Sequence, residues 1–155
     1  MNRVKKEIEC QNSASDIHLK RKAEKMSDKY FEYFQPNPKN NVTCDCTIRA
    51  ICAVTGLGWY EVFDKVIAEA RKECIFPSDR DFMDKRMNLF GLEKRSIPRP
   101  KKGETSLDVQ QFCKLHPKGR YILKTAHHNI GVVDGKYYDL FVNYGQKVYS
   151  YYELI

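Results

Sequence analysis

A two-residue turn near the end of the chain constrains the fold most. Asp134-Gly135 separates two runs with strand character, 129–133 and 136–141. An Asp-Gly pair between such runs is a strong signal for a type I′ turn that joins two antiparallel strands. Residues 120–126 and 147–152 have similar character and are predicted to be further strands. The sequence therefore predicts a C-terminal antiparallel β-sheet.

Before this sheet, apolar residues follow helical spacing. The first predicted helix is apolar on nearly all sides, which indicates burial, and the second carries an amphipathic stripe from Trp59 to Ala70. Ser78 and Asp81 resemble a capping box at the start of the third. The four predicted helices span residues 45–55, 59–72, 78–90 and 105–115. Helices followed by an antiparallel sheet indicate an α+β fold.

The hairpin register selects two side chains that could act together in catalysis. If Asp134-Gly135 is the turn, Val133 pairs with Lys136, and the pairing then continues to Asp139 and beyond. His128 and Asp139 would lie on one face as diagonal neighbours, whereas His127 would point to the other face. We therefore expect His128 to be a general base and Asp139 to orient it.

A cysteine at the start of the buried helix is the expected nucleophile. Thr43 and Asp45 are residue types that cap helices, so Cys46 would lie in the first helical turn. The helix dipole favours a thiolate there, and a neighbouring imidazolium would favour it further. Cys44 is the alternate nucleophile. Cys52 falls in the middle of the helix and is expected to be too buried to react.

Several side-chain amides are candidates for supporting roles. Asn143 lies on the same predicted face as the histidine and aspartate, so it is an alternate third member of the site. An oxyanion would need donors besides the backbone N–H of Cys46. Asn40 and Asn41 in the preceding loop are the favoured candidates, and Gln35 is also available.

The overall composition fits a soluble globular protein that is most simply one domain. The chain has 155 residues, of which 42% are hydrophobic and 30% charged. No apolar run approaches the roughly 20 residues of a membrane span, and no apolar stretch follows the N-terminal charges. We therefore expect a cytoplasmic protein whose six cysteines are free thiols. Residues 1–30 are expected to form a basic arm or an extra helix, and 31–155 the domain.

Basic residues concentrate in one segment. The net charge is +7, and Lys94–Lys102 holds five basic residues and no acidic one. Two prolines predict an exposed loop here, which is either a solvated surface or a contact for an anionic or host-protein partner. A nucleic-acid ligand is a weaker alternative, because no aromatic residues alternate with these basic ones.

A zinc site is the competing chemistry. Cys44, Cys46, His127 and His128 offer four side chains of the two types that zinc most often binds, thiolate and imidazole. Structural zinc sites more often space two cysteines by two to four residues, and neighbouring strand residues point to opposite faces. We therefore expect neither a metal nor a cofactor.

Several segments resemble one known family. Residues 45–51 and 55–62 resemble small papain-like cysteine peptidase domains of bacteriophage and bacterial proteins, which are akin to the peptidases that trim bacteriocin leader peptides. Residues 112–117, 119–123 and 128–140 look like the histidine and aspartate strands of the same group. The resemblance covers the chain from about residue 36 to its last residue.

The resemblance implies a fold, a reaction and a location. The fold would be papain-like, with a central helix carrying Cys46 packed on an antiparallel sheet that carries His128 and Asp139. The reaction would be thiol hydrolysis of a peptide or isopeptide bond, with deamidation or acyl transfer as chemical variants, in the cytosol of a bacterium or phage-infected host. The alternative is a phage-type protein that uses this fold to bind and inhibit a host factor without turnover. Cys44 and the run Leu140–Asn143 depart from the family pattern.

Overall fold

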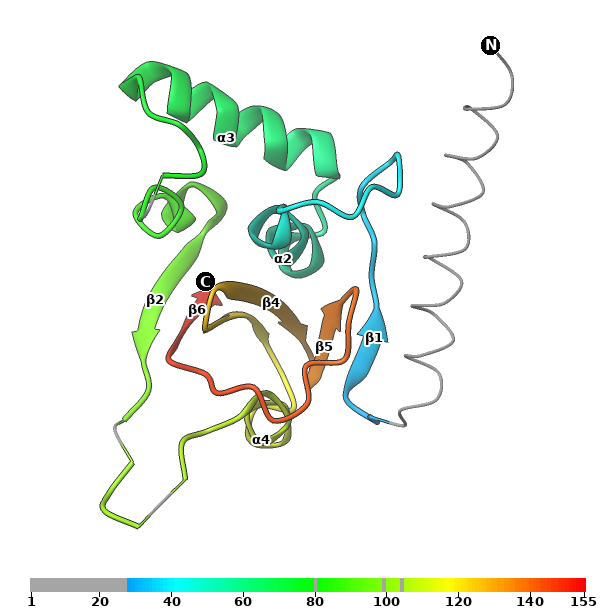
Figure 1. Cartoon of the computed structure of the whole chain (residues 1–155), viewed down its shortest axis with the longest axis vertical. Coiled ribbons are helices and arrows are strands. Elements are labelled where there is room, and N and C mark those ends of the chain that lie inside the picture. The colour runs from blue at the N-terminus through cyan, green and yellow to red at the C-terminus, as the bar shows by residue number, and fades with distance from the viewer. Residues whose placement is uncertain (1–27, 80, 99, 104) are drawn as a thin grey trace.

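The computed structural model describes residues 28–79, 81–98, 100–103 and 105–155, and these form an α+β fold (Figure 1). Residues 1–27 of the predicted arm lie outside the described residues. The described helices are α2 (Cys46–Thr55), α3 (Trp59–Glu73), the 3₁₀ helix η1 (Met87–Phe90) and α4 (Val109–Leu115). The described strands are β1 (Phe31–Tyr33), β2 (Leu92–Ser96), β3 (Arg120–Thr125), β4 (His128–Val133), β5 (Lys136–Asp139) and β6 (Ser150–Leu154).

The six strands form one mixed sheet rather than the expected antiparallel C-terminal sheet. Their order is β1-β5-β4-β3-β6-β2. All neighbours pair antiparallel except β1, which runs parallel to β5. The two edge strands come from before the C-terminal hairpins, and neither was predicted. Four strands of the expected sheet are present, and two earlier segments complete it.

The sheet separates two hydrophobic clusters. Adjacent residues of β3 face opposite sides, as strand geometry requires: Ile122 packs with α2 and α3, and Leu123 packs with α4. Figure 1 shows α2 and α3 above the sheet and α4 below it. Helix α2 packs closely against the sheet. A Cβ added at Gly131 of β4 would lie only 2.8 Å from the Cβ of Ala53 in this helix.

The hairpin register is as predicted. Val133 pairs with Lys136 and Gly131 with Tyr138, and Asp134-Gly135 form the turn, both with positive φ. Strand β4 starts one residue earlier than expected, at His128. His127 lies in the preceding turn with φ 60°, and it is exposed.

The first two helices also match the prediction, and the third does not. Residues 81–86 form turns, and only Met87–Phe90 is helical, as a 3₁₀ turn. Asp81 adopts a left-handed φ of 66°, which is incompatible with an α-helix at that position. Phe82 and Phe90 are nevertheless buried, so the apolar spacing predicted burial correctly. Helix α4 starts at Val109, later than expected, because Asp108 caps it.

The basic segment is not wholly a loop. Lys94 and Arg95 lie in β2, where Arg95 pairs with Glu153 and Glu93. The described residues that follow, 97–98 and 100–103, have no helix or strand. Among the helices that the structure describes, none has the length and apolar character needed to cross a membrane.

Candidate active site

Three predicted side chains meet where three elements begin or end. Cys46 is the first residue of α2, His128 the first of β4, and Asp139 the last of β5. His128 Nε2 lies 2.5 Å from Asp139 Oδ2. The other ring nitrogen, Nδ1, is left for the Cys46 thiol, with which the imidazole is also hydrogen-bonded. The three groups thus form one hydrogen-bonded series.

The site stabilises the thiolate of Cys46. Burial alone would raise its pKa, but hydrogen bonds and the charge of His128 oppose this, and the net effect lowers the pKa below its ordinary value. The hydrogen bonds come from His128, from the backbone N–H of Asn129 and from Thr47. Cys46 is half-buried, so the residue is packed in place but remains partly accessible.

The pKa of His128 is shifted in the opposite direction, above its ordinary value. Burial lowers its pKa, but hydrogen bonds to Asp139 and Cys46, and their negative charges, raise it to about 9. A lowered thiol pKa beside a raised imidazole pKa favours an ion pair of thiolate and imidazolium near neutral pH. This is the state that a thiol nucleophile with an adjacent acid requires.

Asp139 is fixed by more than the histidine. It is buried, and its Oδ1 accepts the backbone N–H of Leu140 at 2.7 Å. Its Oδ2 also accepts the side-chain amide of Asn143 at 2.7 Å. The described hydrogen bonds of the Asn143 side chain go to Asp139 and Phe141, so this asparagine supports the aspartate rather than replacing it.

A buried arginine that sequence reasoning did not identify lies behind the site. Arg49 is only 4% exposed and bridges two carboxylates. It forms an ion pair with Asp45, and its Nη2 lies 3.7 Å from Asp139 Oδ1. Asp45 also accepts Trp59 Nε1 at 2.9 Å. The signal was an acid and a base four residues apart in a helix otherwise expected to be buried. The second contact of Arg49, with Asp139, ties the start of α2 to the end of β5.

Two further polar residues position the thiolate. Asn129 Nδ2 donates to Thr47 Oγ1 at 2.8 Å, which leaves the Thr47 hydroxyl free to donate to Cys46. Asn129 Oδ1 is buried and has no hydrogen-bond partner among the described residues. Sequence reasoning missed both residues, although each is adjacent in sequence to a predicted member of the site.

Donors for an oxyanion exist at the helix start. The N–H groups of the first helical turn have no partner within α2, and Cys46 is in that turn. Asn40 and Asn41 are exposed in the preceding loop, and no described hydrogen bond involves either side chain. Gln35 is occupied in the loop, where its Nε2 donates to Asn41 O at 3.1 Å. The helix N–H groups are therefore the donors already in place.

The remaining cysteines differ sharply from Cys46. Burial raises the pKa of both Cys52 and Cys113 to about 12, and Cys52 is as buried as expected. Cys44 and Cys74 are exposed, and Cys10 lies outside the described residues. Among the described side chains, no group of three or more His, Cys, Asp or Glu is arranged to hold a metal ion.

Comparisons of the chain with protein-family models, with curated proteins and with solved structures gave no match. The chemistry assigned to this site therefore depends on its own geometry.

Proposed function

We propose that this protein is a papain-like cysteine peptidase that cleaves a peptide or isopeptide bond with Cys46, His128 and Asp139. The observation that carries the proposal is the single hydrogen-bonded series of thiol, imidazole and carboxylate. A thiol of lowered pKa, a histidine of raised pKa and a buried carboxylate behind it are the groups that thiol acyl transfer needs.

In the first half-reaction, the Cys46 thiolate attacks the carbonyl carbon of the substrate. The carbonyl oxygen becomes an oxyanion, which N–H groups at the start of α2 stabilise. His128 gives its proton to the nitrogen of the leaving amine as the carbon–nitrogen bond breaks. The acyl group is then bound to the sulfur as a thioester.

In the second half-reaction, His128 is neutral and accepts a proton from water. The resulting hydroxide attacks the thioester carbon, the carbon–sulfur bond breaks, and the thiolate is restored beside a protonated imidazole. Asp139 stays hydrogen-bonded to Nε2 of the ring throughout and keeps Nδ1 directed at the sulfur. Arg49, Asn143 and the Leu140 N–H hold Asp139 in place.

Mass spectrometry of products from a random peptide library tests this proposal. Hydrolysis of an internal amide yields two shorter peptides, whereas deamidation exchanges a side-chain NH₂ for OH, and acyl transfer joins an amine to the peptide. We expect cleavage by the wild-type chain, none by Cys46→Ala, and unchanged cleavage by Cys44→Ala, the matched exposed cysteine. Products that persist in Cys46→Ala would contradict the proposal. A chain that leaves the library intact but binds a host protein would favour the inhibitor alternative.

A further inference from the structure

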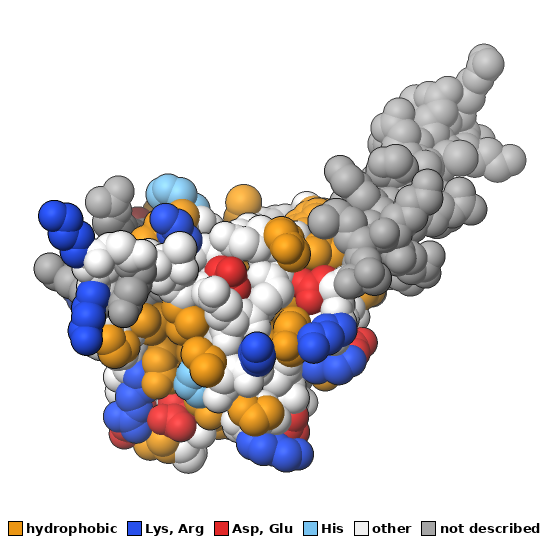
Figure 2. All heavy atoms as spheres, turned by 90° about the horizontal axis from the view of Figure 1, so that it is seen from below, with side chains coloured by type: hydrophobic (Ala, Val, Ile, Leu, Met, Phe, Trp, Pro, Cys, Tyr) orange, Lys and Arg blue, Asp and Glu red, His pale blue; other side chains and the backbone are white. Residues whose placement is uncertain are grey.

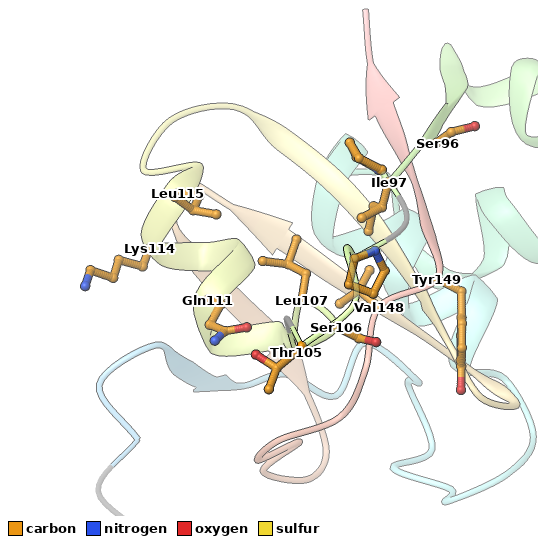
Figure 3. A pocket seen from close by; sticks show the side chains of 13 residues that line it. Ser96, Ile97, Thr105, Ser106, Leu107, Gln111, Lys114, Leu115, Val148 and Tyr149 are labelled. Atoms are coloured by element: carbon orange, nitrogen blue, oxygen red, sulfur yellow. The ribbon is translucent and has the colours of Figure 1, made fainter.

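Helix α4 covers the face of the sheet opposite α2 and α3. Figure 2 shows this side of the molecule, where hydrophobic side chains lie at the surface among Lys and Arg side chains. Figure 3 shows Gln111 and Lys114 of α4 beside a groove that both residues line. The neighbouring Gln110 has a different contact, because its Nε2 donates to Asp28 Oδ2 at 2.6 Å. This bond belongs to a network of polar groups that joins α4 to β5.

Tyr137 of β5 lies at the centre of the network. Its side chain is fully buried, and its hydroxyl donates to Asp28 Oδ2 at 2.7 Å. The same hydroxyl oxygen accepts the backbone N–H of Asn143 at 3.2 Å. Burial and the Asp28 carboxylate raise the pKa of Tyr137, so the hydroxyl keeps its proton and can donate and accept at once.

Asn143 connects Tyr137 to the candidate active site. Its backbone binds the Tyr137 hydroxyl, whereas its side-chain amide donates to Asp139 Oδ2 at 2.7 Å. That oxygen is also the one that His128 Nε2 contacts. Asn143 is only 3% exposed, so bulk water competes little for either bond. A continuous path of hydrogen bonds therefore joins Asp28 to Asp139.

Gln110 holds the same segment from helix α4. Residues 140–146, which follow β5, have neither helix nor strand. The Gln110 side chain donates to Asn143 O at 3.4 Å and accepts the N–H of Gly145 at 3.1 Å. Both backbone polar groups of Asn143 are thus engaged, its N–H by Tyr137 and its carbonyl oxygen by Gln110. Buried polar networks whose members all have partners are rigid, so this segment is held in one geometry.

We infer that Tyr137 is a positioning residue for the catalytic pair of His128 and Asp139. Its hydroxyl holds Asn143, whose side-chain amide then keeps the Asp139 carboxylate directed at His128. The inference rests on the proposed peptidase function and adds to it residues beneath the other face of the sheet. Tyr137 touches no reacting atom, so its effect is on the orientation of the carboxylate that stabilises the imidazolium.

The pH dependence of Cys46 alkylation by iodoacetamide in Tyr137→Phe, followed by peptide mapping, tests the inference. Phenylalanine keeps the ring and removes the hydroxyl, so the Asn143 N–H loses its acceptor. A less firmly held Asp139 stabilises the imidazolium less, and a smaller fraction of Cys46 is then thiolate in acidic buffer. We expect the midpoint of the rate against pH to rise by at least about half a unit, which slows alkylation at about pH 6 roughly threefold. An unchanged midpoint would overturn the inference.

Two comparisons separate positioning from a general loss of stability. Tyr121→Phe is the matched control, because Tyr121 is also buried on this side of the sheet and its hydroxyl donates to Lys118 O at 3.0 Å. That contact lies at the start of β3, whereas the end of β3 pairs with His128, so the midpoint should not change. In an Asn143→Ala chain, Tyr137→Phe should shift the midpoint no further, because the hydroxyl acts through Asn143. An equal shift in Tyr121→Phe, or additive shifts in the double variant, would overturn the inference.

Gln110→Met is a second variant that leaves the buried tyrosine intact. It removes the bonds from α4 to Asn143 and Gly145, so it should raise the midpoint in the same direction as Tyr137→Phe. Arg49, the cation that faces Asp139 from α2, is present in every one of these chains. If Tyr137→Phe does not fold, an unchanged midpoint in Gln110→Met would overturn the inference.

The wild-type chain separates this inference from the proposed function. A wild-type Cys46 that reacts no faster than an ordinary thiol would overturn the peptidase proposal and the positioning role together. A fast Cys46 that slows in His128→Ala and is unchanged in Tyr137→Phe would overturn the positioning role alone.

Discussion

Replacing Asp139 with asparagine should lower the proton affinity of His128. The pKa of His128 stands at about 9 against an ordinary value of 6.5, which corresponds to roughly 3 kcal/mol of preference for the protonated ring. Burial lowers this pKa, and the hydrogen bond with Asp139 is the largest of the effects that raise it. The negative charge of Asp139 raises it further. An amide of the same size removes the charge, so burial should then dominate. We expect the proton affinity of His128 to fall at least about tenfold.

The same shift makes folding stability depend on pH. A histidine whose pKa is raised on folding contributes stability that is fully present below pH 6.5 and is lost as the pH rises through about 9. The wild-type chain should therefore lose stability across that window more steeply than Asp139→Asn. The acid for the leaving amine is lost over the same range, so the wild-type rate should decline near pH 9.

NMR titration of ¹³C-labelled histidines in the full chain measures the effect, with His128→Gln to assign the resonance. Glu32→Gln is the matched control, because it removes an exposed carboxylate paired with Lys136 at the far side of β5. The control should leave the His128 titration unchanged. A His128 midpoint that is the same in Asp139→Asn and wild type would refute the reasoning, as would a wild-type midpoint near 6.5.

Three other substitutions test the surroundings of the site. Arg49→Met leaves two buried carboxylates without their cation and should lower the free energy of unfolding in urea by about 3–5 kcal/mol. The matched change of an exposed arginine, Arg71→Met, should lower it little. A loss below about 1 kcal/mol for Arg49→Met would contradict a structural role for the ion pairs. Gly131→Ala places a Cβ against α2 and should cost about 1–3 kcal/mol, and a neutral result would contradict the close helix–sheet contact. Thr47→Val removes a hydrogen bond to the thiolate and should raise the pKa of Cys46, so that its alkylation slows in mildly acidic buffer; an unchanged pH profile would exclude that contact.

The strongest local signals predicted the part of the fold that carries the site. A two-residue Asp-Gly turn fixes which residues are opposite, and strand periodicity then fixes which share a face. This was enough to place His128 beside Asp139. The capping residue types before Cys46 were enough to place it at a helix start, although Asp45 uses its side chain to bind Arg49 and Trp59 instead of capping the helix.

The edge strands lacked such signals. Strand β1 has three residues and pairs with a strand about a hundred positions later, so nothing in its local sequence specifies its partner. Strand β2 has one buried residue, Leu92, followed by four exposed ones, and its last three residues belong to the basic segment that two prolines predicted to be a loop. Charged residues are common on edge strands, because they discourage pairing with other chains.

The predicted third helix shows the limit of apolar periodicity. Phe82, Met87 and Phe90 do reach the core, but a left-handed residue and a 3₁₀ turn bring them there. Spacing alone reports which residues are buried more reliably than the backbone that buries them. The same reliance on apolar spacing hid Arg49, whose burial depends on two carboxylates, one of them far away in sequence.

The most direct test of the central claim is the pH dependence of iodoacetamide alkylation at each cysteine, followed by peptide mapping in the wild-type chain and in His128→Ala. We predict one fast site at Cys46 that still reacts rapidly at about pH 6 and slows when the imidazole is removed. Slow labelling at every cysteine, with the pH dependence of an ordinary thiol and no response to His128→Ala, would contradict it.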